Sequence, residues 1–514
     1  MKNRIAIVAM MLFFSSHVTA QFTIKDTFAD PLECTYMTRD VFVVWWDNDF
    51  DYSAEVDILL DQIIGYRNEC LNDLNMMDPP GVLDDYYQNI YLHGDGGHFD
   101  SYGWGNGVGT DSNGYPFYTM PYYLFDDIIT VAHEIFHLYQ YNSNSSGFEY
   151  AGDSQWYIEA SANWFGARQD FTAERAFIEA ESLVRLPHLP FWLSFDNFPS
   201  SYPQNWQRYV HQYALALYLF YLTEQVGISP NVISEGFYMG LSETPQEYLY
   251  NELGASDYRN NFIEWAARMT NDFDFITTNQ KTANELEWLA YADSDDENEF
   301  TETFDVNGTS GWYQPSNELT TNAWSFNTYQ IENNMSTSYT FEINGDENGL
   351  FGTPSYFQGK VIVKNAIGDS RFYDVLMTDN TNGSVSIEVD SLDTDISFII
   401  ASMPAYFEEI NQDFQLFPYQ MKITNDILGV SDMGTPNFID AYPNPFEQSL
   451  RINLQEYEDE VNIELYSILG KRVFRETYFK VKEIQIELSN IHTGMYFLKV
   501  SSNNRSNTLK LLKQ

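Results

Sequence analysis

The pattern of apolar positions divides this 514-residue sequence into stretches of different character. In the first stretch, apolar and aromatic runs over 41–46 and 87–92 predict strands. Apolar residues at the helical period predict helices over 52–74, 125–139, 155–165, 205–227 and 253–273. This stretch therefore predicts a domain of mixed α and β structure over residues 21–292.

The next stretch, residues 300–428, consists of short alternating runs and predicts an all-β sandwich. The runs are 338–343, 359–363, 384–389 and 396–400, and turn signals at Asn344-Gly345 and Asn382-Gly383 separate them. An acidic run over 293–299 predicts a solvated linker before this domain. Residues 429–440 predict a second linker, and residues 441–514 predict a third, small all-β domain.

The N-terminus has the pattern of a signal peptide over residues 1–20. Two basic residues precede a short apolar run, and Val18-Thr19-Ala20 ends in small residues. No later stretch reaches the roughly 18 uncharged apolar residues of a membrane-spanning helix. We therefore expect an exported protein without a transmembrane segment. In such a protein Cys34 and Cys70 either form a disulfide or stay as two thiols, and both alternatives are open.

The formal net charge of −48 changes the expected partners. A surface this acidic argues against nucleic acid and anionic membranes. Calcium binding and a salty medium suit it equally. Asp47, Asp49 and Asp51 alternate after a predicted strand, but Tyr52 and Ile58 stand where an EF-hand needs Gly and Glu. We interpret these acids as a polar turn, so Ca²⁺ is only a weak cofactor hypothesis.

Candidate chemistry lies in the helix predicted over 125–139, which contains the motif H-E-x-x-H. Residues four apart lie on one face of a helix, so His133 and His137 can bind one metal ion. Glu134 would then be the general base of a hydrolase in which Zn²⁺ activates a water molecule. A buried helix that carries two histidines by chance is the alternative.

A third ligand stands 22 residues after His137. Glu159 is an acid among apolar and small residues of the next predicted helix, and buried carboxylates are rare unless they are paired or bind metal. An antiparallel return of the chain would bring Glu159 back to the two histidines. A half-exposed acid on a helix is the alternative.

With these residues the sequence resembles the gluzincins, which are zinc metallopeptidases whose third ligand is a glutamate on a helix shortly after H-E-x-x-H. The resemblance covers roughly residues 85–270 and implies a zincin-like α+β catalytic domain. It implies Glu134 as the general base and three zinc ligands: His133, His137 and Glu159. Some members orient the first histidine with an acid four residues after the glutamate ligand. Here that residue is Asn163, whose amide can accept the same hydrogen bond. The third histidine of the metzincin motif is absent.

Gluzincins also stabilise the oxyanion with a Tyr or His from a later helix. The resemblance makes His211 the first candidate and Tyr209 or Tyr213 the next. Aromatic residues of a buried helix commonly belong to the core, which is the alternative. Upstream, the Gly-rich stretch 102–109 is either an edge strand that pairs with an extended peptide or a surface loop.

The last stretch resembles the C-terminal sorting domain of the type IX secretion system of Bacteroidota. The resemblance is carried by Tyr442-Pro443-Asn444-Pro445-Phe446, by 462–473, by 494–500 and by a basic tail, 510–513. It implies export through the periplasm and across the outer membrane by the type IX secretion machinery. Release or attachment to the cell surface would follow.

Together these features predict a multidomain protein: an α+β zincin-like catalytic domain, an all-β sandwich and a small all-β sorting domain. The predicted function is a secreted zinc metallopeptidase acting on peptide or protein substrates, with Glu134 and His211 as catalytic residues. One alternative is an inactive zincin-fold surface or adhesion protein that binds glycan or protein through its β-domain. The other is a metallohydrolase that does not cut peptides.

Overall fold

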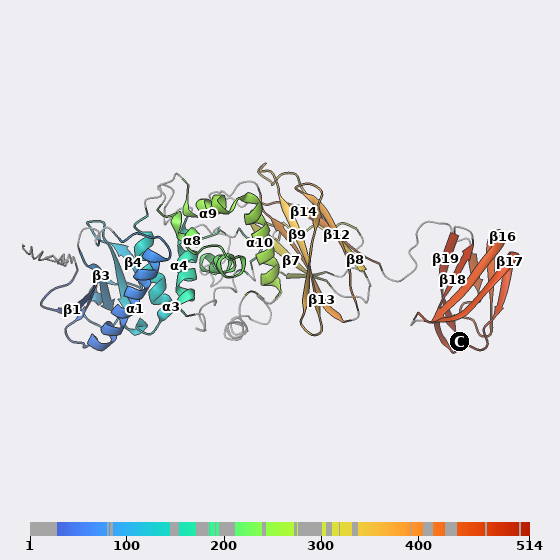
Figure 1. Ribbon diagram of the computed structural model, residues 1–514, viewed down its shortest axis with the longest axis horizontal. Helices are drawn as coiled ribbons and strands as arrows, with labels where there is room; N and C mark the ends of the chain where they lie inside the picture. Colours follow the sequence, from blue (N-terminus) through green and yellow to red (C-terminus); the bar gives the residue numbers. More distant parts are fainter. Residues whose placement is uncertain are drawn as a thin grey trace, which may run out of the picture. The chain divides into compact units, whose positions relative to one another are not determined.

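The protein is described by a computed structural model (Figure 1). The residues described are 28–79, 82, 86–143, 154–170, 183, 186–190, 192–194, 211–238, 243–271, 275, 301–304, 311–317, 319–331, 338–390, 392–404, 415–426, 439–467, 470–502 and 505–514. The predicted signal peptide and acidic linker lie outside these residues. Contacts group the chain into two compact units. The first comprises Met1–Asn333, Thr340–Ser386 and Leu392–Ile423, and the second comprises Asn334–Tyr339, Ile387–Ser391 and Thr424–Gln514.

A five-stranded sheet begins the first unit, in the order β1-β2-β3-β5-β4. The strands are β1 (Cys34–Arg39), β2 (Phe42–Asp47), β3 (Gln88–His93), β4 (Gly107–Thr110) and β5 (Pro116–Pro121). The three central strands are parallel and buried, whereas β1 and β4 are antiparallel edges. Helix α1 (Ser53–Asn72) connects β2 to β3. The strands predicted over 41–46 and 87–92 and the helix over 52–74 are confirmed.

Three details of this region bear on alternatives that the sequence left open. The Gly-rich stretch contains both an edge strand and irregular chain, because η1 (His98–Tyr102) is followed by β4. The acids after β2 form a polar turn, since Asp47 accepts hydrogen bonds from the backbone N–H groups of Asp49 and His98. Cys34 and Cys70 are both buried, and no disulfide joins them in the structure.

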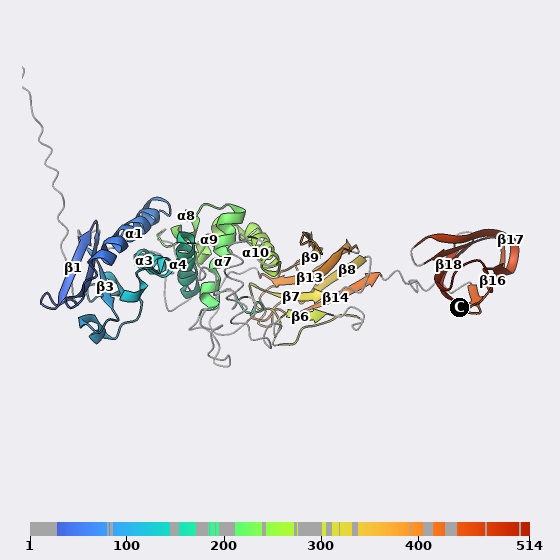
Figure 2. The same ribbon diagram turned by 90° about the horizontal axis from the view of Figure 1, so that it is seen from below.

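Helices α3 (Ile128–Gln140) and α4 (Gln155–Gln169) follow the sheet and pack against each other (Figure 2). Asp127 caps α3 by accepting a hydrogen bond from the Thr130 N–H, which sets the start of the helix. The end of α3 meets the beginning of α4, because Gln140 Nε2 donates to the Ile158 carbonyl over 3.1 Å. The pair is therefore antiparallel, as the spacing between His137 and Glu159 predicted.

Gly166 allows this close approach. A Cβ atom at Gly166 would lie 2.6 Å from the Ile129 carbonyl oxygen at the opposite end of α3. Gly166→Ala is therefore expected to push the two helices apart and to cost about 1–3 kcal/mol of unfolding free energy. Denaturant unfolding would measure the loss. Gly65→Ala at an exposed position of α1 is the matched control, because no atom lies within 4 Å of the added Cβ. The control should be neutral or stabilising by up to about 1 kcal/mol. Equal stability of the two variants would contradict the prediction.

The later helices differ in detail from the predicted ones. They are α7 (Ala216–Phe220), the π-helical η4 (Tyr221–Val226), α8 (Asn231–Glu235), α9 (Pro245–Leu253) and α10 (Ala255–Thr270). Gly227, with φ of +79°, ends η4 as predicted. The single helix predicted over 253–273 is wrong at its start, because Gly254 at φ +79° separates α9 from α10.

A two-sheet β region follows the helices, with sheet orders β10-β9-β13-β7-β6 and β11-β12-β8-β14. The strands are β6 (Thr301–Phe304), β7 (Ser325–Ile331), β8 (Ser338–Gly345), β9 (Phe357–Asn365), β10 (Ser370–Asp374), β11 (Leu376–Met377), β12 (Asn382–Glu388), β13 (Asp393–Ser402) and β14 (Tyr419–Asp426). The four predicted strands are confirmed. Both predicted turn signals lie at strand ends, since Gly345 ends β8 and Asn382 begins β12, although the residues themselves belong to the strands. The missing side chains of Gly345 and Gly383 admit Phe357 and Met377 respectively.

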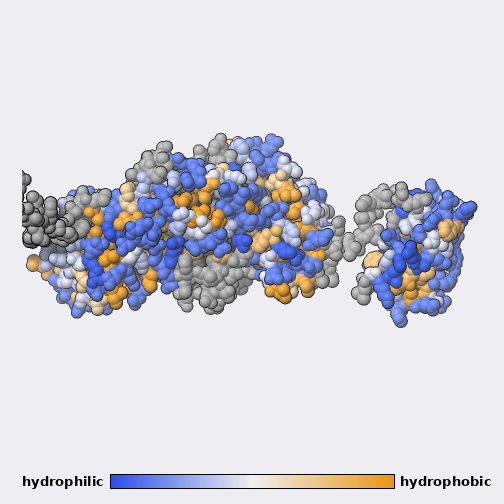
Figure 3. Space-filling model, viewed as in Figure 1, coloured by the Kyte–Doolittle hydropathy of each residue, from blue (hydrophilic) through white to orange (hydrophobic). Residues whose placement is uncertain are grey.

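Helix α10 packs on the sheet that contains β9 (Figure 1). The buried Lys360 of β9 forms ion pairs with Glu264 of α10 and with Asp374. Aromatic rings extend this contact: the ring centroids of Phe262 in α10 and Trp324, just before β7, lie 5.6 Å apart. The helical region and the β-sandwich therefore share one core. Polar residues cover most of the described surface seen in Figure 3, in keeping with the net charge.

The second unit is built on long antiparallel strands. They are β15 (Ile439–Tyr442), β16 (Ser449–Ser467), β17 (Arg472–Glu487), β18 (Gly494–Ser502) and β19 (Arg505–Lys513). Their alternating apolar residues form a separate hydrophobic core. The segment predicted to be a basic tail is instead the end of β19, because it pairs with β18. None of the helices in the described ranges is long and apolar enough to span a membrane.

Candidate metal centre

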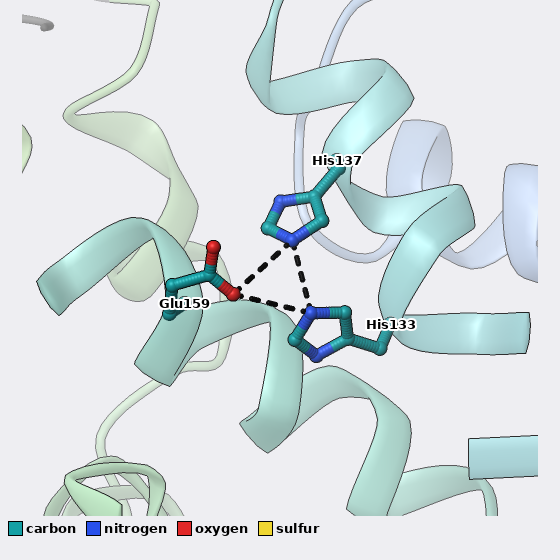
Figure 4. A group of neighbouring side chains, drawn as sticks. All are labelled: His133, His137 and Glu159. Atoms are coloured by element: carbon teal, nitrogen blue, oxygen red, sulfur yellow. Dashed lines mark hydrogen bonds and ion pairs between the residues drawn. The ribbon is translucent and has the colours of Figure 1, made fainter. Parts of the chain in front are cut away.

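Three side chains from α3 and α4 converge on one point (Figure 4). His133 Nε2 lies 2.9 Å from His137 Nε2, and Glu159 Oε2 lies 3.3 Å and 3.5 Å from these two atoms. All three residues are buried. Within the described ranges, no other cluster of three or more His, Cys, Asp or Glu brings its ligand atoms this close. The antiparallel pairing of α3 and α4 creates this cluster.

The spacing fits a tetrahedral metal ion. Ligand atoms about 2.0–2.1 Å from a tetrahedral Zn²⁺ lie about 3.3–3.4 Å apart. The three observed separations, 2.9, 3.3 and 3.5 Å, bracket this value. Two imidazoles and one carboxylate are also a common donor set of catalytic zinc sites, which leave a fourth position open. The residues present therefore fit Zn²⁺.

Hydrogen bonds orient both imidazoles toward this point. His133 donates from Nδ1 to Asn163 Oδ1 over 2.9 Å, and His137 donates from Nδ1 to Gln140 Oε1 over 2.6 Å. Gln140 is itself held, because its Nε2 donates to Ser161 Oγ over 2.8 Å and to a backbone carbonyl. Each imidazole therefore holds a proton on Nδ1 and directs Nε2, the atom that would bind a metal ion, at the cluster.

Burial and mutual charge shift the pKa values within the cluster. Burial raises the pKa of Glu159, but the two neighbouring histidines outweigh it and hold the pKa well below its ordinary range. Burial likewise lowers the pKa of His137, yet the charge and hydrogen bonding of Glu159 raise it to about 9. Glu159 is therefore ionised at neutral pH, and binding of a metal ion would release the proton that His137 then holds.

Glu134 lies beside the cluster without belonging to it. Burial raises the pKa of its carboxyl, and the two histidines partly offset that effect. Asn106, which precedes β4, donates from Nδ2 to Glu134 Oε1 over 2.8 Å. Glu134 is thus a buried carboxylate next to the candidate ligands, with one oxygen held by an amide.

The candidates for the oxyanion role lie in different surroundings. Tyr213 is close to the cluster, since its ring centroid is 6.0 Å from that of His133 and its carbonyl accepts from Asn163 over 3.5 Å. His211 is completely buried and donates from Nε2 to the Pro190 carbonyl over 3.3 Å. Tyr209 lies outside the described residues. The geometry therefore favours Tyr213 over the first sequence-based candidate, His211, whose ring nitrogen is engaged with a backbone carbonyl.

Two buried histidines near the Pro190 segment remain neutral at ordinary pH. Burial lowers the pKa of His211 to about 4, although its hydrogen bond to Pro190 opposes the shift. Burial, together with the proximity of His211, lowers the pKa of His188 to about 4. The unfolded pKa is about 6.5. The stability that these neutral histidines contribute is therefore complete above pH 6.5 and is lost as pH falls toward 4.

His211→Gln should remove part of this pH dependence while keeping a donor for Pro190. Between pH 7 and pH 5 the wild type should lose about 2 kcal/mol more stability than the variant. Unfolding curves at the two pH values measure this difference. His98→Gln is a contrasting control, because hydrogen bonds to Phe28 and Glu33 overcome burial and raise the pKa of His98. His98→Gln should therefore lower the free energy of unfolding more at pH 5 than at pH 7. An unchanged pH dependence in His211→Gln would contradict the prediction.

Sequence reasoning missed three residues around the site. Gln140 follows His137 by three positions on one helix face, so helical spacing alone could have indicated it. Asn106 lies in the Gly-rich stretch 102–109 and contacts Glu134, and Tyr118 of β5 contacts Asn106. Strand pairing brings them to the site, and no local signal predicts that pairing.

Two known family models together match most of the chain. Residues 33–428 match a family of unknown function, DUF6055, and the chain belongs to that family. Residues 440–514 match the secretion system C-terminal sorting domain. This match confirms the predicted sorting domain and means that the type IX machinery delivers the protein to the cell surface or the extracellular space. The gluzincin resemblance remains a prediction, because the DUF6055 match assigns no activity.

A search of curated proteins finds no match. Three of the matching solved structures are distantly similar to this chain. The BSP domain of a biofilm-associated protein is 10% identical over 34% of this chain and 45% of its own, with a TM-score of 0.13. A two-domain fibronectin type III segment of chicken tenascin is 10% identical over 33% of this chain and 97% of its own, also with a TM-score of 0.13. A β-1,2-glucanase from Parabacteroides distasonis is 8% identical over 35% of this chain and 28% of its own, with a TM-score of 0.12. The chain thus spans less than half of the first of these proteins, and TM-scores this low assign neither fold nor function.

Proposed function

We propose that this protein is a secreted zinc-dependent metallopeptidase of gluzincin type. The observation that carries the proposal is the convergence of His133 Nε2, His137 Nε2 and Glu159 Oε2 within 3.5 Å, with Glu134 buried beside them. The donor set, its spacing and the orientation of both imidazoles all suit Zn²⁺. A chance pair of histidines on a helix would not require this surrounding set of hydrogen bonds.

The roles of the side chains follow from their chemistry. His133, His137 and Glu159 hold the metal, and bound zinc supplies Lewis acidity and lowers the pKa of water. Glu134 accepts a proton from the attacking water and passes it to the leaving amine. Burial raises the pKa of Glu134, which makes its carboxylate a stronger base toward the attacking water. Tyr213, close to His133, is the favoured donor for the oxyanion.

The edge strand β4 supports a peptide as substrate. β4 pairs with β5 along one side and ends the order of its sheet. It begins directly after Asn106, which contacts Glu134. An extended peptide that adds to the outer side of β4 would therefore run past the candidate general base, and backbone pairing of this kind holds peptides by their main chain.

Two measurements on the purified exported protein test the proposal. Metal analysis should find about one zinc ion per chain. A digest of casein and of a peptide library should show cleavage that a chelator stops and that added Zn²⁺ restores. A protein that binds zinc but cuts no peptide would refute the peptidase and favour either a binding role or another metallohydrolase. A protein that binds no zinc would refute the metal centre itself.

A further inference from the structure

An amide from the sheet region holds the Glu134 carboxylate. Asn106 Nδ2 donates to Glu134 Oε1 over 2.8 Å, which is the geometry of a strong charge-assisted hydrogen bond. Asn106 is exposed, whereas Glu134 is only 8% exposed. The amide therefore engages one carboxylate oxygen from a position that reaches solvent, and it leaves the other oxygen for other partners.

Tyr118 contacts the oxygen end of the Asn106 amide, whose nitrogen end faces Glu134. Its hydroxyl donates to Asn106 Oδ1 over 2.9 Å, and its side chain is completely buried on β5. Burial, with the nearby charges of Glu134 and Asp127, raises the pKa of Tyr118 well above its ordinary value, so the phenol keeps its proton and remains a donor. A flipped amide would direct Oδ1 at the Glu134 carboxylate, where two acceptors would face each other. The observed orientation is therefore strongly preferred.

The backbone on both sides of Asn106 is also held. The Gly105 carbonyl accepts from Thr119 Oγ1 over 2.8 Å and from His93 Nε2 over 3.2 Å. The Gly107 carbonyl lies 3.1 Å from the same Thr119 hydroxyl, and Gly107 pairs with Thr119 across the β4–β5 ladder. The amide is thus attached to the rigid sheet on which Tyr118 and Thr119 stand.

We propose that Asn106 and Tyr118 are positioning residues that fix the orientation of the Glu134 carboxylate for proton transfer, an inference that rests on the proposed function. The sheet holds Asn106, Tyr118 orients its amide, and the amide orients the general base. A general base must lie within hydrogen-bond reach of the proton it takes. A misplacement of about 1 Å lowers rates up to about 100-fold, so the loss of this support should appear in kcat.

Steady-state kinetics on a fluorogenic peptide chosen from the library test this role. Asn106→Asp keeps the shape but sets a second carboxylate against Glu134, and kcat should fall about 100-fold. Tyr118→Phe only frees the amide to rotate, and kcat should fall about 10-fold. KM should change less than about threefold and zinc content should not change, because neither residue is a ligand. Asn113→Asp and Tyr123→Phe make the same changes at exposed positions and should keep wild-type kcat. Wild-type kcat in Asn106→Asp would overturn the proposal.

A thermal double-mutant cycle gives a readout that needs no activity. Asn106→Asp should lower the melting temperature through like-charge repulsion with Glu134. Adding Glu134→Gln should restore much of that loss, because a Gln amide can donate to the new Asp carboxylate. Additive losses would overturn the Asn106–Glu134 contact. If the wild type binds zinc but cuts no peptide, the proposed function fails, and this cycle still decides whether the amide holds Glu134.

Discussion

Glu134→Gln is expected to reduce peptide hydrolysis by about 10²–10⁴-fold, the range that a positioned general base contributes. Gln has nearly the same shape as Glu, and its carbonyl can still accept the hydrogen bond from Asn106. What it lacks is the ability to accept a proton from water. The loss should therefore appear in kcat, with little change in KM.

Zinc content distinguishes this loss from a damaged site. Glu134 lies next to the ligand cluster but outside it, so Glu134→Gln should retain about one zinc ion per chain. Glu55→Gln, an exposed change of the same kind in the first turn of α1, should behave as the wild type. A Glu134→Gln protein with full activity would assign the proton acceptor to another group.

Glu159→Ala is expected to remove zinc from the protein, and with it all hydrolysis. Glu159 supplies the single negative charge among the three candidate ligands, and its carboxylate is ionised and buried. Loss of a residue that only orients a ligand costs about 10–100-fold in metal affinity, so loss of a ligand should cost more than about 100-fold. Competition with a chromogenic chelator measures the zinc affinity directly.

Asn163→Ala provides the graded comparison. It removes the acceptor for His133 Nδ1 but leaves all three ligands, so zinc affinity should fall only about 10–100-fold. The expected order of zinc affinity is wild type, then Asn163→Ala, then Glu159→Ala. Wild-type zinc affinity in Glu159→Ala would show that Glu159 is not the third ligand and would remove the basis for the gluzincin assignment.

Local patterns predicted the regular elements where side-chain chemistry and backbone preference agree. The β-branched and aromatic run of β2 and the helical spacing of α1 and α3 are examples. Local patterns did not predict strands whose composition is unusual for a strand but which pair with a neighbouring strand. The Gly-rich β4 is a strand because β5 supplies its hydrogen bonds, and the lysine-bearing end of β19 is a strand because β18 does.

The sequence by itself determined the elements that local chemistry encodes: the H-E-x-x-H helix, the acid on the following helix and the sorting domain that directs the protein out of the cell. Only the tertiary structure decided what meets at the site. The close packing at Gly166 and the antiparallel return of α4 bring Glu159 to the histidines, and strand pairing brings Asn106 to Glu134. The physical reason is that helical periodicity is a property of neighbouring residues. Contacts between elements instead depend on packing and pairing across long separations in the chain, which a local pattern does not contain.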